Sequence, residues 1–514
     1  MDNKKDIFDI FIIGGGINGV AIARDAAGRG MSVILAEKGD LASETSSKST
    51  NLIHGGLRYL EYFDFKLVRN ALQEREVLLQ NMPHIAKQLR LILPISPDMR
   101  FESETPAGRL LGIFMPWLKG KRPGWIIRIG LWLYDHLGGN SKFPSTTSIK
   151  LQNTKEGNPL KSKYKKAYEY SDGWVHDARM VVLMASDAVK RGAKILTRNK
   201  VESLQRENSV WKIDTEQGRF YAKSIVNASG PWVEKIMCQT TNQKSKVHVR
   251  LVRGSHIITK KLFDHEKAYL LQGSDCRIIF AIPYEREFTL IGTTEVPHEN
   301  ADIEPECSNQ EIEYLCNFAS DYFEANIAPD DVIITFSGVR PLYDDGAKSS
   351  TAATRDYLLN LNNDGAPILN VFGGKITTHR ILAEEVLNKL SKYLTIGASW
   401  TKFSPLPGGE FKLTERETHF ARLLADYPFL NETWAQRLFC SYGLDAWKVL
   451  GNACNIDDLG ENFGADLTAR EIDYLRANEF AKTSEDILWR RSQLGLRINK
   501  KAAQSIDIYM KIEK

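Results

Sequence analysis

The sequence of 514 residues lacks several features that would place it in a specialised class. No apolar run approaches the roughly 20 residues that a membrane-spanning helix needs, and there are no repeats or low-complexity segments. The six cysteines are scattered without a C-x-x-C pair, which indicates reduced thiols rather than a disulfide framework. The net charge of +4 does not indicate nucleic-acid binding. We also expect no bound metal.

The composition is that of an ordinary globular protein with a real core. Hydrophobic residues make up 43% of the chain and charged residues 26%. The length predicts about two to four domains, at roughly 100–200 residues each. The first five residues lead directly into a predicted strand and leave no room for a signal peptide. Together with the reduced cysteines, this predicts a cytoplasmic protein.

The most informative stretch is a glycine cluster near the N-terminus. The mostly apolar residues 9–13 predict a strand, and the run rich in small residues at 20–27 predicts a helix directly after the cluster. Between them, Gly14, Gly16 and Gly19 fit G-x-G-x-x-G, the turn that lets a pyrophosphate approach the backbone. Glu37 follows a second predicted strand at the distance expected for the acid that binds a ribose hydroxyl. This order of elements predicts a dinucleotide site.

A polar, hydroxyl-rich loop at 40–51 follows and leads into a Gly-Gly pair at 55–56. Such a loop could donate hydrogen bonds to a cofactor, or it could be an ordinary solvated loop. Residues 66–90 then predict a helix with Pro83 near its end. Two later stretches, 224–230 and 367–374, are apolar strands that end in glycine, where ligands bind in α/β sheets.

At this point the sequence resembles a known family, the FAD-dependent glycerol-3-phosphate dehydrogenases of the aerobic bacterial type. The resemblance runs in order through nearly the whole chain. It is carried by the glycine turn and by residues 23–30, 45–61, 170–175, 227–232, 253–256, 337–342, 354–357, 372–375 and 406–409. One departure is His379, which stands where the family usually has tyrosine after Gly-Gly-Lys.

The resemblance implies an α/β fold of three parts. An FAD-binding Rossmann-like domain of the glutathione-reductase or D-amino-acid-oxidase type is expected from residues 1–85, 165–235 and 335–395. Residues 86–164 and 236–334 would form an antiparallel β-sheet substrate domain, with predicted strands at 250–258, 276–282 and 288–294. Residues 400–514 carry four amphipathic patterns and are expected to form an all-α C-terminal domain.

The family also implies site residues. The residues expected to bind the substrate are Arg58, Tyr59, Arg340, Arg355, Lys375 and Thr378. The residues expected to act in catalysis are His256, Arg340 and Lys375. Cofactor binding falls to Gly14, Gly15, Gly16, Asn18, Gly19, Glu37, Thr45, Ser46, Ser47, Ser49, His54, Gly55, Gly56, Ala228, Gly230, Trp232, Gly373, Gly374, Lys375 and Thr377.

These residue types suit the oxidation of a phosphorylated secondary alcohol. Arginine offers forked donors to phosphate, although a single arginine is more often part of a surface salt bridge. Histidine has the pKa nearest working pH, so His256 is the preferred proton acceptor, with His54 as its competitor and Lys375 as a further candidate. His256 could instead be a hydrogen-bonded core histidine.

The expected reaction is therefore oxidation of sn-glycerol 3-phosphate to dihydroxyacetone phosphate, with electrons passing from reduced FAD to a membrane quinone. A homodimer is expected as well. The alternatives are an oxidase that uses dioxygen, a related FAD-dependent oxidoreductase for amines or hydroxy acids, and a flavin-binding protein without turnover.

A basic and aromatic segment at about 100–137 predicts contact with the cytoplasmic face of a membrane. Between 109 and 137 there are five basic residues and one acid, interleaved with Trp, Phe and Leu. Trp117, Trp125 and Trp132 would lie at the interface, and Leu111, Phe114 and Ile127 would reach deeper. The alternative is a buried helical hairpin with solvated basic residues.

Overall fold

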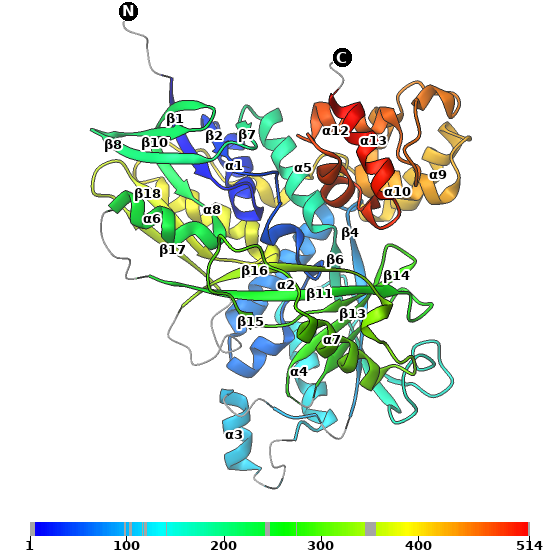
Figure 1. Ribbon diagram of the computed structural model, residues 1–514. Helices are drawn as coiled ribbons and strands as arrows, with labels where there is room; N and C mark the ends of the chain where they lie inside the picture. Colours follow the sequence, from blue (N-terminus) through cyan, green and yellow to red (C-terminus); the bar gives the residue numbers. More distant parts are fainter. Residues whose placement is uncertain are drawn as a thin grey trace, which may run out of the picture.

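The computed structural model describes residues 6–96, 99–101, 105–115, 117, 121–139, 141–241, 247–344 and 356–511. Two β-sheets lie one above the other in Figure 1, and a helical region formed by the C-terminal part of the chain sits beside the upper sheet. The α3 helix (Pro106–Phe114) projects at the opposite end of the molecule. Among the described helices, none is both long and apolar enough to cross a bilayer.

The first sheet carries the glycine turn. Its strands lie in the order β17 (Tyr357–Asn362), β18 (Ile368–Gly373), β10 (Gly218–Asn227), β1 (Ile7–Ile13), β2 (Val33–Ala36) and β7 (Lys194–Leu196). Strands β18, β10, β1, β2 and β7 are parallel, and the hairpin of β8 (Val201–Glu207) and β9 (Val210–Thr215) extends from β10. The carboxyl ends of β1, β10 and β18 therefore meet at one edge, as expected for a ligand site.

One face of this sheet is covered by helices. Helices α1 (Ile17–Gly28), α5 (Asp177–Lys190) and α8 (His379–Leu390) bury their apolar sides against β1, β2 and β18. Helix α1 can lie close to its strand because it is built from small residues, including Ala21, Ala23, Ala26 and Ala27. This packing fixes the glycine turn at the junction of β1 and α1.

The second sheet is larger and lies below the first in Figure 1. Its order is β15 (Val296–Pro297), β11 (Val249–Lys260), β14 (Phe288–Gly292), β13 (Ile278–Tyr284), β12 (Ala268–Gln272), β4 (Ala86–Pro94), β6 (Lys166–Val175) and β3 (Leu52–Ile53). Strand β16 (Val332–Tyr343) pairs with β11, and β5 (Thr147–Lys150) pairs with β6. Helices α2 (Phe65–Asn81) and α4 (Gly124–Leu137) contribute to one core beside it, and α7 (Asn309–Tyr322) to another.

The expected fold class is confirmed, with two refinements. The second sheet is mixed, because β12 pairs in parallel with β4, whereas the other strand pairs of this sheet are antiparallel. The helix expected over 66–90 ends at Asn81, and β4 begins at Ala86. Proline has no backbone N–H, so Pro83 separates these elements instead of lying within the helix. Strands β6 and β16 also belong to the second sheet, whereas the proposed domain division assigns them to the first.

The C-terminal region consists of short helices around a core of its own. They are α9 (Arg416–Asp426), α10 (Glu432–Tyr442), α11 (Ala446–Leu450), α12 (Ala469–Asn478), a π-helical turn (Asp486–Arg491) and α13 (Lys500–Lys511). These helices agree with the amphipathic patterns in the sequence.

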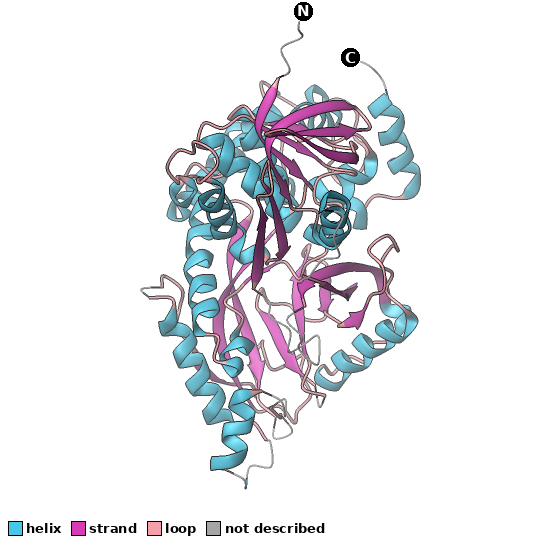
Figure 2. Ribbon diagram, turned by 90° about the vertical axis from the view of Figure 1, so that its left-hand side faces the viewer, coloured by secondary structure: helices cyan, strands magenta, loops and turns pink. Residues whose placement is uncertain are grey.

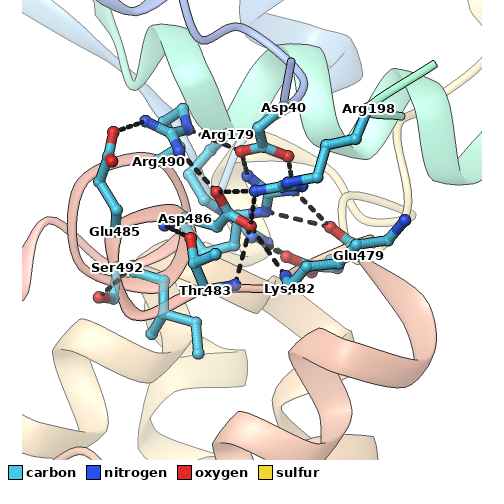
Figure 3. Close-up of polar contacts among 12 residues, drawn as sticks. Asp40, Arg179, Arg198, Glu479, Lys482, Thr483, Glu485, Asp486, Arg490 and Ser492 are labelled. Carbon is cyan, nitrogen blue, oxygen red and sulfur yellow. Dashed lines mark hydrogen bonds and ion pairs between the residues drawn. The ribbon is translucent and has the colours of Figure 1, made fainter. Parts of the chain in front are cut away.

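A buried ionic network attaches this region to the first sheet (Figure 3). Asp40, in the loop after β2, accepts hydrogen bonds from Arg490 Nε at 2.6 Å and Arg491 Nη2 at 2.8 Å. Asp486 accepts from Arg198 at 2.8 Å, and Arg179 pairs with Glu479. Asp40 and Arg491 are buried, so removing Asp40 would leave the charge of Arg491 without its carboxylate partner. The network therefore fixes the loop beyond Glu37 to the C-terminal helices.

Candidate active site

Two cavities meet where the first sheet faces the second. The cofactor cavity, of about 330 Å³, lies at the glycine turn, and the substrate cavity, of about 520 Å³, lies between the two sheets and α4. Their shared lining residues are Thr45, Pro341, Gly373 and Gly374. A ligand at the glycine turn could therefore extend past these residues into the substrate cavity.

Glycine suits each of the three positions of the turn for a different structural reason. A Cβ at Gly19 would lie 1.9 Å from the carbonyl oxygen of Gly14, so this position permits close packing of helix on turn. Gly14 has a φ of 108°, which favours glycine. A Cβ at Gly16 would meet only Ser46 Oγ, at 3.1 Å. The fold does not require glycine there, but the approach of a phosphate does.

The cofactor cavity fits a dinucleotide. Gly16, the N-cap of α1, has no side chain to accept hydrogen bonds, so the first-turn backbone N–H groups beyond Ile17, which donates to Ser46 Oγ, can serve an anion. The Oδ1 atom of Asn18 is buried without a hydrogen-bond partner, while its Nδ2 donates to the Gly373 oxygen. Glu37 accepts hydrogen bonds from the backbone of Gly15 and Gly39 at 2.6 and 2.7 Å. These bonds hold its carboxylate at the cavity wall.

The predicted cofactor residues are divided between the two cavities. The cofactor cavity is lined by Gly14, Gly16, Asn18, Glu37, Thr45, Ser46, Ala228, Gly230, Trp232, Gly373 and Gly374. The substrate cavity is lined by Thr45, Ser49, His54, Gly56, Gly373, Gly374, Lys375 and Thr377. Gly15, Gly19, Ser47 and Gly55 line neither cavity. Gly55 instead donates its N–H to Tyr134 Oη at 2.7 Å, which anchors this loop to α4.

Cationic side chains gather in the wall of the substrate cavity. Arg58, Arg340 and Lys375 line it, as the sequence predicts, together with Tyr59. The Nζ of Lys375 lies 3.7 Å from the centre of the Tyr59 ring, a cation–π contact that positions the amine. Arg340 donates to Thr293 Oγ1 at 2.9 Å, which orients its guanidinium beside the cavity. This arrangement suits an anionic ligand.

The two candidate histidines occupy different positions. His54 lines the cavity and packs edge-on against Phe280. His256 is buried, stacks on Phe336, and does not line the cavity; its Nε2 lies 3.0 Å from the hydroxyl of Thr50, which does. Burial lowers the pKa of His54 to about 4 and that of His256 to about 3. Both rings are therefore neutral near pH 7, and both are weaker bases than an ordinary imidazole.

Other predicted residues lie away from the cavity or outside the described residues. Thr378 is buried at the start of α8 and lines neither cavity. His379 is buried with its Nδ1 2.6 Å from the Ile376 oxygen, so the position of the family tyrosine belongs to the packing of α8. Arg355 falls outside the described residues.

The sequence did not single out several residues that line the cavity. Lys48 and Thr50 come from the hydroxyl-rich loop, and Thr293 and Glu295 follow β14. Burial lowers the pKa of Lys48, and the charge of Arg490 lowers it further. Lys48 could have been predicted as a cavity residue, because it lies within the 45–61 motif of the family. Nothing in the sequence showed that the end of β14 would reach the same wall.

Comparison with known proteins agrees with this geometry. A family model for FAD dependent oxidoreductases matches residues 9–380, and one for the C-terminal domain of alpha-glycerophosphate oxidase matches residues 399–512. The chain is 46% identical to D-erythritol 1-phosphate dehydrogenase of Brucella abortus, over 95% of this chain and 95% of that protein. It is 43% identical to glycerol-3-phosphate dehydrogenase of Pseudomonas aeruginosa, over 99% and 96%.

A solved structure has the same fold. Glycerol-3-phosphate dehydrogenase from Bacillus halodurans, complexed with FAD, superposes with a TM-score of 0.72 at 22% identity, covering 99% of this chain and 95% of that one. FAD is therefore the cofactor of this protein, as expected, and the chain belongs to the family of FAD-dependent oxidoreductases that includes the glycerol-3-phosphate and D-erythritol 1-phosphate dehydrogenases.

Proposed function

We propose that this protein is an FAD-dependent dehydrogenase of a phosphorylated polyol, and that sn-glycerol 3-phosphate is its substrate. The observation that carries the proposal is the set of cations, Arg58, Arg340 and Lys375, in a cavity that adjoins the cofactor cavity. A phosphate needs such charge-assisted donors. The match to glycerol-3-phosphate dehydrogenases over nearly the whole chain supports the same substrate.

Different residues would bind the cofactor, bind the phosphate and accept the proton. FAD, held by the glycine turn and Glu37, supplies a hydride acceptor. Arg340 and Lys375 hold the substrate phosphate, and Arg355 is retained as a further phosphate ligand. We assign proton acceptance to His256 acting through the Thr50 hydroxyl, because only Thr50 of this pair lines the cavity. His54, which lines the cavity directly, is the alternative.

A second candidate substrate is D-erythritol 1-phosphate. The 46% identity to its dehydrogenase favours it, and the cavity is large enough for a four-carbon chain. Anaerobic reduction of the bound flavin, followed by its absorbance, separates the two. Faster reduction by glycerol 3-phosphate at matched concentration supports our assignment, and faster reduction by D-erythritol 1-phosphate replaces it. Reduction by neither would contradict the polyol phosphate class.

We further propose that the enzyme rests on the cytoplasmic face of a membrane and passes electrons to a quinone. Helices α3 and α4, together with Trp117 between them, carry a group of large exposed apolar side chains, Leu110, Ile113, Phe114, Trp117, Trp125, Ile129 and Trp132. Phe114 and Trp117 are 70% and 71% exposed, which is unusual for such residues. Arg109 and Lys121 are exposed beside them and suit anionic headgroups.

One detail of the membrane prediction was wrong. Ile127 was expected to reach into the bilayer, but it is 8% exposed and packs in the core beside the second sheet. The side chain of Leu111 is outside the described residues. The outward-facing positions of α4 are instead 125, 129 and 132, which share one helical face.

Two measurements test the remaining parts of the proposal. Reoxidation of the reduced enzyme by quinone in liposomes, compared with reoxidation by dissolved oxygen, separates a dehydrogenase from an oxidase. Faster reoxidation by oxygen would exclude the quinone. We also propose a homodimer, which light scattering of the purified enzyme tests by its mass.

A further inference from the structure

We propose that Glu311, which lies behind the second sheet, is a positioning residue that fixes the guanidinium of Arg340 for the substrate phosphate. This inference rests on the proposed binding of phosphate by Arg340 and adds what holds that side chain in place. Glu311 lines neither cavity, so it would act only through the residues that lie between.

The second sheet separates Glu311 from the substrate cavity. Figure 2 shows helices on both sides of this sheet, and alternate residues of β11, β13 and β14 belong to the core beside α4 and to the core beside α7. Because successive residues of a strand point to opposite faces, Gly254 opens to the cavity, whereas the Ser255 hydroxyl points toward α7. Glu311, in the first turn of α7, therefore meets the back of the cavity wall.

On the cavity side, the segment that follows β14 holds the guanidinium of Arg340. Its Nη2 donates to Thr293 Oγ1 at 2.9 Å, and its Nη1 donates to the Thr294 oxygen at 3.5 Å. A Cβ at Gly254 would lie 2.6 Å from this Nη2 and 2.7 Å from Thr293 Oγ1, so the guanidinium rests directly on the strand. The direction of the guanidinium thus depends on where residues 293–294 lie.

On the other side, the two carboxylate oxygens of Glu311 have different partners. Its Oε2 accepts hydrogen bonds from the Ser308 N–H at 3.1 Å and from Arg253 Nη2 at 2.6 Å. Its Oε1 accepts from Thr294 Oγ1 at 2.7 Å and from Ser255 Oγ at 2.8 Å. The capping box of α7 needs only the bond to the Ser308 backbone. The bonds to Oε1 connect the same carboxylate to the cavity wall.

These partners join the three segments that place Arg340. Thr294 Oγ1 accepts from the Ser255 N–H at 2.9 Å, and the Thr294 N–H donates to the Ser255 oxygen at 3.2 Å. The Ser255 hydroxyl also lies 2.7 Å from that of Ser337, on β16, the strand that carries Arg340. Glu311, Ser255, Thr294 and Ser337 are all buried. Since water cannot replace a lost partner there, removal of one group should shift the others.

Glu311 acts here as a charged acceptor. Burial opposes its ionisation, but hydrogen bonds from Thr294, Ser308 and Ser255 outweigh burial and hold the pKa of this carboxyl below its usual range. Hydrogen bonds to an ionised acceptor are shorter and stronger than those between neutral groups. The wall behind Arg340 is therefore held more firmly than hydroxyl groups alone would hold it.

A binding measurement tests the inference without turnover. Glycerol 2-phosphate has no secondary hydroxyl, so the oxidised holoenzyme should bind it without oxidising it. Its Kd would be measured by isothermal titration calorimetry in the parent, in Glu311→Ala and in Thr294→Val, each also combined with Arg340→Ala. Thr294→Val removes one hydroxyl at nearly constant volume, so it carries the test if Glu311→Ala does not fold.

We expect the Kd to rise about five- to tenfold in both variants, and this rise to vanish beside Arg340→Ala, because no guanidinium is left to position. Asn431→Ala is the control. It removes the N-cap of α10, which accepts from the Trp434 N–H at 2.8 Å in a region that lines neither cavity. This variant should lower the melting temperature and leave the Kd unchanged.

Two binding results would overturn the inference. One is an unchanged Kd in both Glu311→Ala and Thr294→Val. The other is a rise in Kd that persists beside Arg340→Ala, because Glu311 would then support the fold in general and not this guanidinium.

Flavin reduction by glycerol 3-phosphate separates positioning of the phosphate from other effects. Glu311→Ala and Thr294→Val should raise the substrate concentration that gives half the limiting rate by about five- to tenfold, and change the limiting rate by less than about twofold. A fall in the limiting rate alone would contradict the assignment to Arg340. If the Kd shifts as expected but no polyol phosphate reduces the flavin, the proposed function fails and this inference stands.

Discussion

The two cavities of this enzyme are built in opposite ways. Half of the residues that line the cofactor cavity come from one stretch, residues 13–46. The substrate cavity takes polar side chains from more widely spaced stretches, among them residues 45–61, 293–295 and 375–377 and the single positions 122, 272, 340 and 356. Recognition of the cofactor is therefore more local in sequence than recognition of the substrate, which depends on the pairing of distant strands.

The largest effect should come from a substitution in the cofactor cavity. Gly16→Val would block the approach of the pyrophosphate, and because a Cβ there meets only Ser46 Oγ, the fold itself should survive. We expect a folded protein with almost no bound flavin, measured by absorbance and circular dichroism. Gly130→Val is the matched control in the other cavity and should keep its flavin. A yellow Gly16→Val protein with full stoichiometry would refute this role of the turn.

The proton acceptor should give the next largest effect. His256→Ala and Thr50→Val should each slow flavin reduction by about 10²–10⁴-fold while FAD stays bound. The His54→Ala variant should reduce its flavin nearly as fast as the parent if His256 is the acceptor. If flavin reduction is instead slow in His54→Ala and fast in His256→Ala, His54 is the acceptor.

The pH dependence of flavin reduction follows from the pKa values of the same two histidine rings. Because the pKa of His256 is lowered to about 3 and that of His54 to about 4, each stays deprotonated above those values. The rate of flavin reduction should therefore be flat between about pH 6 and 8 and fall only toward pH 4 or below. A rate that declines through pH 6.5 would indicate a histidine with an ordinary pKa.

Loss of a phosphate ligand should have a smaller effect. Arg340→Ala removes a charge-assisted contact worth about 1.5–3 kcal/mol, which corresponds to about 10- to 150-fold in kcat/KM. Flavin content should not change, since Arg340 lines only the substrate cavity. Glycerol, which lacks the phosphate, should be a poor substrate for both proteins. A normal kcat/KM in Arg340→Ala would place the phosphate elsewhere, with Arg355 the next residue to test.

The smallest effect concerns the exposed apolar side chains at and beyond the end of α3. Replacing Phe114 and Trp117 by serine should shift the enzyme from anionic liposomes to the supernatant and lower quinone activity more than dye activity. Moderate salt should weaken binding of the parent without abolishing it, because apolar burial persists when charges are screened. If the double variant sediments like the parent, the membrane contact lies elsewhere, and the C-terminal helices should be examined.

The same contrast explains what the sequence could predict. The strand, turn, helix and acid beside the cofactor cavity are close together in the sequence, so their spacing alone singled out Gly14, Gly16 and Glu37, which line that cavity, and Gly19, which packs against the turn. Arg340 and Lys375 were found through motifs of a known family. The burial of His256 could not be seen, because it depends on β11 lying between β14 and β16. Likewise, the inward orientation of Ile127 follows from the position of the second sheet.

The network around Asp40 should couple the C-terminal helices to cofactor binding. Asp40 lies three residues beyond Glu37, so a single loop carries both a carboxylate in the wall of the cofactor cavity and the salt bridges to Arg490 and Arg491. By thermodynamic linkage, whatever FAD contributes to ordering this loop also favours docking of the helices, and docking raises the affinity for FAD by the same factor. Saturating FAD should accordingly slow proteolysis within 400–514, and Asp40→Asn should uncouple the two events.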